Sequence, residues 1–372
     1  MIEKLLKKAV YTFSGFFHRN SEKWMFASHT QYSDNSRYLF QDPYNPCNIR
    51  KIWIAKNIDE YEIVKALGYE CYLKGSCKAI FHSLTAKYYI YTCYLSDIGY
   101  AFSKNAICIN LWHGIPIKKI EFDIENGPLA KKFDDSVLSK IKHPEIYRYS
   151  NFILCPSNFV YNYSFKSAFK IDESQILKFP YPRLIFLKSI KTKERRFTFF
   201  YAPTWRDTNV DFINSSFFDL KKINNFCIKF NCLFKIKLHP NSNITINTEY
   251  YENIIFIDSN DDTNIYLAEA DCLITDYSSI FFDYLIFDNP ILFYVFDEST
   301  YKTENREIYS EVEHIDFGEK IYNLNELLQI MQLTLEGVDK CTNQREEARN
   351  TFSINFKDTD NKRLIDYIVN EI

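Results

Sequence analysis

Short apolar segments alternate with amphipathic segments along most of the chain, and this alternation limits the folds open to it. In the first half, five segments are predicted to be buried strands: Trp24–Ser28, Ile49–Ala55, Glu70–Leu73, Tyr88–Thr92 and Ala106–Trp112. Three segments between them have helical patterns: Ser36–Phe40, Ile58–Leu67 and Cys77–Ala86. Strands and helices that alternate at this spacing are typical of a parallel sheet with helices on both faces. The first half is therefore predicted to be an α/β domain.

The second half repeats the pattern after a charged run at Lys188–Arg196, where we place a domain junction. Its predicted strands are Phe197–Tyr201, Leu233–Leu238, Ile254–Ile257, Cys272–Thr275 and Ile291–Val295. A chain of 372 residues is long enough for about two domains, each with its own core. Two α/β halves of similar size are typical of the GT-B fold, in which two Rossmann-like domains face each other across a cleft.

Charge and cysteine usage exclude several classes of protein. The formal net charge of −3 argues against a nucleic-acid-binding surface, which needs an excess of basic residues. The ten cysteines are scattered and include no CxxC pair, so a reduced, cytoplasmic compartment is expected and neither a disulfide framework nor a metal site. No segment approaches the roughly 18 uninterrupted apolar residues of a membrane-spanning helix.

The first twenty residues form a separate amphipathic segment. Apolar residues recur there at helical spacing, with Lys4, Lys7 and Lys8 largely between them. Such a pattern suits a helix that lies on an anionic lipid surface, and it suits equally a helix that packs on the domain. Both interpretations stay open, and a cleaved signal peptide is disfavoured because no small-residue cleavage site follows.

Ligands of parallel sheets bind beyond the carboxyl ends of the strands, so we examine the residues that follow each strand. His113 and Gly114 follow the strand that ends near Asn110. An imidazole there could act as a general base, and the glycine would let a substrate approach the main chain. A structural role for the histidine is the alternative.

Two further strand ends carry groups that could bind phosphate. Thr204 and Arg206 follow the first strand of the second half, where a hydroxyl and a guanidinium could bind phosphate oxygens. Alternatively, this is a surface loop in which Arg206 pairs with its neighbour. Lys237 and His239 lie at the end of the next strand, and the imidazole could stabilise charge on a departing phosphate or serve only as a structural cap.

The most informative strand end is Thr275–Ser279, which leads into an apolar helical run. Asp276 or Ser278 is predicted to cap that helix. Free main-chain N–H groups at a helix start, with the hydroxyls of Ser278 and Ser279, would form an anion site suited to a pyrophosphate. Three polar groups at one buried helix start exceed what a cap requires, so we favour a functional role.

Taken together, these segments resemble the CDP-glycerol glycerophosphotransferase family, which includes teichoic-acid primases and polymerases and their capsule-synthesis relatives. The family pattern W-H-G-T-P-L-K is met at Trp112–Lys118, except that Ile115 and Ile117 replace Thr and Leu. The Tyr201–Asp207, His239–Pro240 and Thr275–Ser279 segments fit without departure. At Pro180–Ile185, where the family usually has G-Y-P-R-N-D, only the Tyr-Pro-Arg core is kept.

The resemblance implies transfer of an alditol phosphate, expected to be glycerol phosphate from CDP-glycerol, to a polymer or lipid-linked hydroxyl, with release of CMP. Residues 21–190 would bind the acceptor and carry His113 as the base, and residues 191–372 would bind the nucleotide. The resemblance makes His113 and His239 catalytic. Substrate binding falls to Gly114, Lys118, Thr204, Arg206, Lys237, Asp276, Ser278 and Ser279. Asp276 would orient either His239 or a ribose hydroxyl.

No tightly bound metal or cofactor is expected, because no Walker or glycine-rich dinucleotide motif is present, although Mg²⁺ could assist the pyrophosphate. The expected location is the cytoplasmic face of the cell membrane, with peripheral attachment. Three alternatives stay open: a GT-B glycosyltransferase that uses a nucleotide sugar, a CDP-ribitol ribitolphosphotransferase, and a non-catalytic partner in a wall or capsule assembly complex.

Overall fold

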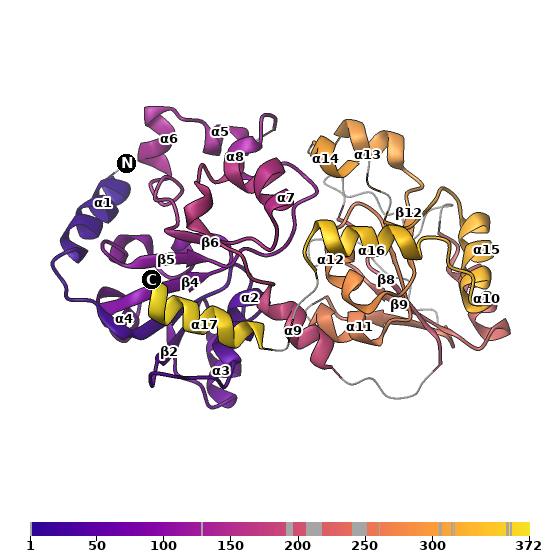
Figure 1. The fold of residues 1–372 in the computed structure, drawn as a ribbon, viewed down its shortest axis with the longest axis horizontal. Helices are drawn as coiled ribbons and strands as arrows, with labels where there is room; N and C mark the ends of the chain where they lie inside the picture. The colour runs from indigo at the N-terminus through magenta and orange to yellow at the C-terminus, as the bar shows by residue number, and fades with distance from the viewer. Residues whose placement is uncertain are drawn as a thin grey trace. The chain divides into compact units, whose positions relative to one another are not determined.

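Two parallel β-sheets with helices around them make up the chain (Figure 1). The structure is a computed structural model that describes residues 2–127, 129–190, 196–205, 218–239, 251–259, 261–304, 307–313, 315, 317–354, 357 and 359–372. The chain divides into two compact units. Unit 1 comprises Met1–Gly114, Lys119–Phe186 and Phe356–Ile372, and unit 2 comprises Ile115–Lys118 and Leu187–Asn355.

Unit 1 contains a parallel sheet of seven strands in the order β3-β2-β1-β4-β5-β6-β7. The strands are β1 (Asn20–Phe26), β2 (Arg50–Ala55), β3 (Cys71–Leu73), β4 (Ala86–Tyr91), β5 (Ile107–Asn110), β6 (Phe152–Leu154) and β7 (Ile176–Leu177). The chain runs outward from β1 to β3, returns to β4 beside β1, and then runs outward in the other direction. The reversal between β1 and β4 is a topological switch point, where α/β proteins commonly bind ligands.

Unit 2 contains a parallel sheet of six strands in the order β10-β9-β8-β11-β12-β13. The strands are β8 (Thr198–Tyr201), β9 (Leu233–Lys237), β10 (Ile254–Ile257), β11 (Cys272–Thr275), β12 (Ile291–Tyr294) and β13 (Glu319–Ile321). Every residue of β8, β11 and β12 is buried, as expected for strands covered on both faces. Here the order reverses between β8 and β11, so this pair forms the second switch point.

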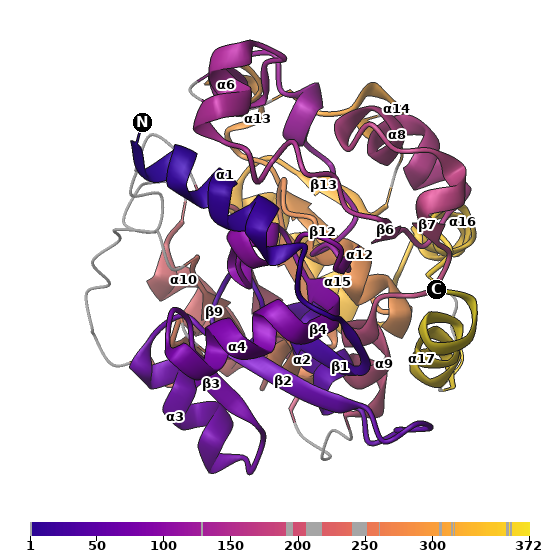
Figure 2. The ribbon, with the colours of Figure 1, turned by 90° about the vertical axis from the view of Figure 1, so that its left-hand side faces the viewer.

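Helices cover both sheets. Those of unit 1 are α1 (Ile2–Ser14), α2 (Asp34–Gln41), α3 (Ile58–Ala66), α4 (Cys77–Thr85), α5 (Ala130–Phe133), α6 (Val137–Lys142), α7 (Asn158–Val160), α8 (Lys166–Ala168) and α17 (Asp360–Glu371). α9 (Pro182–Ser189) spans the boundary between the units. Those of unit 2 are α10 (Leu220–Lys229), α11 (Thr263–Glu269), α12 (Ile280–Tyr284), α13 (Glu298–Glu304), α14 (Ser310–Glu313), α15 (Leu324–Leu335) and α16 (Thr342–Thr351). In Figure 2, α1 and α4 lie on the side of unit 1 that faces the viewer.

The predicted fold class is confirmed, because both halves are α/β units built on a parallel sheet. Each predicted strand overlaps a strand of the structure, and each predicted helix overlaps a helix. Three strands were missed, namely β6, β7 and β13, which are only two or three residues long. Such short segments are too short to show the alternation by which a strand is recognised.

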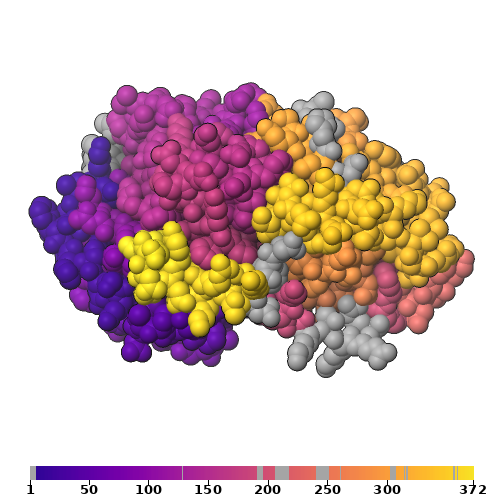
Figure 3. Space-filling model, viewed as in Figure 1, coloured from indigo at the N-terminus to yellow at the C-terminus, as the bar shows by residue number. Residues whose placement is uncertain are grey.

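The division into units differs from the expected ranges 1–20, 21–190 and 191–372. Helix α17 lies in the expected second domain but belongs to unit 1, where its atoms (yellow, lower left) cover indigo and violet segments (Figure 3). Tyr44 Oη donates a hydrogen bond to Asp366 Oδ1 at 2.7 Å, and Asn361 Nδ2 donates to Asp42 Oδ2 at 3.0 Å. Residues Ile115–Lys118 belong instead to unit 2.

Candidate active site

His113 lies in the loop that follows β5, next to the switch-point strand β4. Its ring is exposed, and its Nδ1 lies 3.1 Å from the Sγ of Cys93, in the loop after β4. The main chain of Thr92, beside the ring, acts to raise its pKa. The Trp112 ring packs on the histidine with 4.1 Å between ring centroids. The imidazole is thus held on one side and open to solvent on the other, as a general base requires.

The electrostatic surroundings keep this imidazole neutral. Protein atoms lie densely around the ring although part of it reaches solvent, and this desolvation is the main cause of a lowered pKa for His113. The guanidinium of Arg183 lowers the pKa further, and the carboxylate of Asp34 opposes both effects. A histidine with a pKa below its ordinary value of 6.5 is unprotonated at neutral pH and can accept a proton.

Gly114 is required by the main chain of this loop. Its φ is +145°, and a Cβ atom built there would lie 3.0 Å from Nη2 of Arg183. We expected the glycine to give a substrate access to the main chain. The structure shows another reason for it, since a side chain would be strained and would press on the guanidinium.

In unit 2, Asp276 joins the two loops of the switch point. Its Oδ1 accepts hydrogen bonds from the main-chain N–H of Thr204 at 2.8 Å and of Tyr277 at 2.6 Å. The side chain is buried, so these bonds fix the loop after β8 to the end of β11. The cap of the following helix was predicted to be Asp276 or Ser278, and Asp276 does not fill this role because its carboxylate is directed to the neighbouring loop.

The helix start at β11 includes both predicted serines. Helix α12 has Ser279 as its N-cap residue, without a side-chain capping bond, while Ser278 Oγ accepts a hydrogen bond from the N–H of Ile280 at 3.4 Å. Ser278 is half-buried and Ser279 is exposed. The hydroxyls therefore lie at the first turn of α12, as predicted, and Ser278 is the one that caps it.

His239 is exposed just after β9. Its ring stacks on Trp205, with 6.2 Å between centroids, and this contact joins the loops after β8 and β9. Desolvation, and then the charge of Lys237, lowers the pKa of His239. At neutral pH this imidazole is best suited to donate a hydrogen bond as a neutral ring.

The structure shows main-chain contacts for Lys237 and does not describe Arg206. The Lys237 ammonium is buried and donates to the carbonyls of Asp258 and Ser259 at 2.9 and 2.6 Å. Two of its three N–H groups thus anchor the loop after β10, and the expected role of Lys237 in substrate binding stays a prediction. Arg206 lies outside the described residues.

Lys118 belongs to unit 2 although it is only five residues from His113. Its Nζ lies 4.9 Å from the ring centroid of Tyr301, which stacks on Tyr277 at 3.6 Å. Tyr277 follows Asp276 directly, so Lys118 is connected through the aromatic pair to the end of β11. No sequence pattern predicts this tyrosine pair, because its two members are 24 positions apart and lie in different segments.

Unit 1 therefore contains His113 and Gly114, and unit 2 contains Lys118, Thr204, Lys237, His239, Asp276, Ser278 and Ser279. Among the described residues, no three His, Cys, Asp or Glu side chains are grouped so as to hold a metal ion. No helix in the part of the chain that the structure describes is long and apolar enough to cross a membrane. The expectation on metals stays a prediction.

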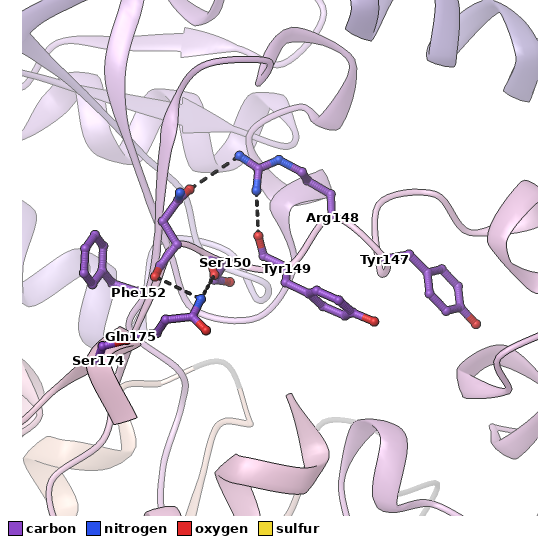
Figure 4. Close-up of a pocket in the computed structure, with 8 residues that line it drawn as sticks. Tyr147, Arg148, Tyr149, Ser150, Phe152, Ser174 and Gln175 are labelled. Atoms are coloured by element: carbon purple, nitrogen blue, oxygen red, sulfur yellow. Dashed lines mark hydrogen bonds between the residues drawn. The ribbon is translucent and has the colours of Figure 1, made fainter. Parts of the chain in front are cut away.

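A cavity of about 470 Å³ in unit 1 lies away from these residues (Figure 4). Tyr147, Arg148 and Gln175 are among its lining residues. Arg148 donates to the Tyr149 carbonyl at 2.8 Å, and Gln175 donates to the Ser150 carbonyl at 3.3 Å. These residues precede β6 and β7, at the amino ends of the strands, whereas His113 follows the carboxyl end of β5. The cavity is therefore not part of the candidate site.

Comparison with known proteins agrees with this geometry. The family model described as CDP-Glycerol:Poly(glycerophosphate) glycerophosphotransferase matches residues 10–372. A teichoic acid poly(glycerol phosphate) polymerase of Bacillus spizizenii is 27% identical, with 92% of this chain and 89% of the relative covered. A teichoic acid glycerol-phosphate transferase of Staphylococcus aureus is 25% identical, with 95% and 94% covered.

Among solved structures, the wall teichoic acid polymerase TagF matches with a TM-score of 0.80 at 21% identity, with 100% of this chain and 95% of that chain covered. At this identity the match bears on the fold, which is the same pair of α/β units. The family match spans both sheets and every strand end described above. The chain is therefore an enzyme of the CDP-glycerol:poly(glycerophosphate) glycerophosphotransferase family.

Proposed function

We propose that this enzyme transfers glycerol phosphate from CDP-glycerol to a hydroxyl of a teichoic-acid-like polymer, and that His113 is the general base. The acceptor oxygen attacks the phosphorus next to glycerol, and a new P–O bond forms. The bond from that phosphorus to the bridging oxygen breaks, and CMP leaves with the bonding electron pair. The acceptor proton passes to the imidazole of His113.

The observation that supports this role is the state of the His113 ring. It is exposed, its pKa is lowered, and its Nδ1 lies 3.1 Å from the Cys93 Sγ. In the neutral tautomer that donates from Nδ1 to this sulfur, Nε2 carries the lone pair that accepts a proton. A positioned base of this kind typically contributes about 10² to 10⁴-fold to rate.

Unit 2 would bind the nucleotide at its switch point. The loops after β8, β9 and β11 place Thr204, His239, Ser278 and Ser279 at the carboxyl ends of neighbouring strands. Hydroxyl and imidazole donors at such a position suit the oxygens of a diphosphate. In this proposal, His239 donates a hydrogen bond to the phosphate that departs with CMP. Lys118 adds positive charge beside the aromatic pair of Tyr277 and Tyr301.

The first prediction concerns which nucleotide the enzyme releases. Purified enzyme given a glycerol-phosphate primer should release CMP from CDP-glycerol, and should release no UDP from UDP-glucose or UDP-N-acetylglucosamine. CDP-ribitol should give less CMP than CDP-glycerol. Chromatography of the products measures both. Release of UDP in proportion to enzyme would identify a glycosyltransferase, and absence of any nucleotide release over a panel of primers would favour a non-catalytic partner.

We also propose that the enzyme works at the cytoplasmic face of the membrane and attaches through α1. The inner side of α1 packs on unit 1, where Tyr11 stacks on Tyr100 at 4.8 Å. Leu6 and Phe13 of α1 are 63% and 61% exposed, and Phe16, in the turn that follows α1, is 82% exposed. Large apolar side chains on a lysine-rich helix favour an anionic lipid surface. The two sequence interpretations of this helix are thus compatible.

The second prediction tests α1. Replacing Phe13 and Phe16 with serine should lower flotation with vesicles of phosphatidylglycerol and phosphatidylcholine several-fold, because two exposed rings no longer enter the interface. Phe81→Ser is the matched control, since Phe81 is 57% exposed on α4. Equal flotation of the double variant, the control and the unsubstituted enzyme would rule out α1 as the attachment site.

For metal ions the proposal is that none is tightly bound and that Mg²⁺, where it assists, arrives with the nucleotide diphosphate.

The ten cysteines are all free, which fits a reducing compartment.

A further inference from the structure

The loop that carries His113 has an unusual main-chain conformation. Trp112 has φ +50° and Gly114 has φ +145°, on either side of the histidine. A left-handed conformation costs a residue with a side chain about 1–2 kcal/mol. Such a conformation persists only when the surrounding structure holds it. The contacts that hold this loop therefore also determine where the His113 ring lies.

Asn35 is one of these contacts. It lies in the first turn of α2, and its side chain is fully buried. Its Nδ2 donates to the carbonyl of Trp112 at 2.8 Å and of Leu111 at 3.4 Å. Its Oδ1 accepts a hydrogen bond from the main-chain N–H of Arg183 at 3.2 Å. One amide group thus links the loop after β5 to the first turn of α9.

Arg183 completes the connection. Its Nη1 donates to the carbonyl of His113 at 2.7 Å and to Asp34 Oδ1 at 2.7 Å. The Arg183 side chain is 9% exposed and that of Asp34 is 20% exposed, so the pair is shielded from solvent. Asp34 Oδ1 also accepts from the N–H of Asn35 at 2.8 Å. The carbonyls of both Trp112 and His113 are therefore bonded to side chains from other segments.

We propose that Asp34, Asn35 and Arg183 act as a clamp on the main chain of residues 111–113, and that the clamp holds the His113 imidazole in its orientation for proton transfer. All three are positioning residues: Asn35 and Arg183 bind the main chain of the loop, and Asp34 holds the Arg183 guanidinium. This inference rests on the proposed role of His113 as the base.

A second set of contacts, made by Asn110, holds only the start of the loop. The orientation of the His113 ring therefore still depends on the clamp. Asn110 Oδ1 accepts from the N–H of Trp112 at 2.9 Å, and Asn110 Nδ2 donates to the Cys93 carbonyl at 3.2 Å. These bonds fix where the loop leaves β5, before the histidine. Beyond them, the clamp binds the loop at the carbonyls of Leu111, Trp112 and His113. A small shift there would move a base away from an acceptor oxygen, for which misplacement by about 1 Å can cost 10²-fold in rate.

The third prediction tests the clamp with Arg183→Lys, which keeps the charge but loses the planar fork that reaches a carbonyl and a carboxylate together. We expect kcat to fall at least about 10-fold, with the KM for CDP-glycerol changed less than about 3-fold, because the base is displaced and the nucleotide site is in unit 2. Arg19→Lys is the matched control. The Arg19 guanidinium also binds carbonyls, those of Ser83, Ala86, Phe102 and Lys104, at the amino end of the same sheet.

The pH dependence of kcat/KM is a second measurement, which a purely structural role of these residues would not change. The charged or titratable groups around the imidazole are Asp34, Arg183, His29 and Cys93. Asp34→Asn removes a charge that raises the pKa of His113, so the acid limb of kcat/KM should shift to lower pH. Arg183→Gln removes a charge that lowers this pKa, so the limb should shift to higher pH. Thermal unfolding of each variant shows whether it is folded.

The outcomes separate this inference from the proposed function. If His113→Ala is inactive but the kcat and acid limb of the Asp34 and Arg183 variants match those of Arg19→Lys, the clamp is only structural and the inference is wrong. If His113→Ala keeps full activity, the proposed function itself fails. Should Arg183→Gln not fold, the nearly isosteric Asp34→Asn and the charge-preserving Arg183→Lys still decide the question.

Discussion

Replacing His113 with alanine is expected to lower kcat for glycerol phosphate transfer by about 10²–10⁴-fold, the range that one positioned general base contributes. The neutral imidazole is the only group we assign to accept the acceptor proton. Its loss should leave the nucleotide site intact, because Thr204, His239 and Ser278 belong to unit 2. Steady-state kinetics with CDP-glycerol and a defined primer, together with calorimetric binding of CDP-glycerol, measure both effects.

His143→Ala is the matched control for this variant. His143 also belongs to unit 1, and its Nδ1 lies 3.7 Å from Glu145 Oε1, after the carboxyl end of α6. Its removal should change kcat less than about 3-fold, as for most substitutions away from a site. Undiminished turnover by His113→Ala would show that another group takes the proton. A fall in nucleotide affinity as large as the fall in kcat would show that His113 binds substrate instead.

Asp276→Ala is expected to raise the KM for CDP-glycerol at least 10-fold. The substitution leaves the buried N–H groups of Thr204 and Tyr277 without their acceptor, and each such loss costs about 1–3 kcal/mol. Because the loop after β8 then loses its bond to the Asp276 carboxylate, the donors that we propose for the diphosphate lose their fixed spacing. A change of 1.4 kcal/mol in binding is about tenfold in affinity.

The same two strands provide the control for Asp276. Asp271 Oδ2 accepts from the N–H of Thr198 at 2.8 Å, at the amino ends of β8 and β11. Asp271→Ala therefore removes the same kind of bond from the opposite edge of the sheet. It should lower the melting temperature but leave the KM for CDP-glycerol within about 2-fold, as for a site remote from the substrate. Equal KM values for the two variants would contradict a nucleotide site at the β8/β11 switch point.

The strands and the residues that follow them were predictable from sequence, because buried strands in parallel sheets are continuous apolar runs and polar residues mark their ends. His113, Ser278 and Ser279 were identified as candidate site residues in this way. The contacts of Asp276 and Lys237 were not, since a carboxylate or an ammonium near a strand end can bind either substrate or main chain. Only coordinates show that Asp276 accepts from Thr204 and that Lys237 donates to two carbonyls.

The clamp was not predicted for a different reason. Arg183 is about 150 positions from the adjacent residues Asp34 and Asn35, and pairing across such a distance leaves no periodic pattern. The one available signal was Arg183 itself, which matches the family pattern together with Tyr181 and Pro182. In the sequence, this partial match was only a weak motif.

The return of α17 to unit 1 has a consequence for biosynthesis. Unit 1 is assembled from segments on both sides of unit 2, so on a ribosome all of unit 2 emerges before Asp360–Glu371 is available. Until then, the partners of Asp42, Tyr44 and Tyr88 in that helix are missing. The surface of the first sheet on which α17 packs therefore stays uncovered until that helix has been synthesised. A ribosome-bound chain stopped before residue 360 should accordingly be more sensitive to protease in unit 1 than the released protein.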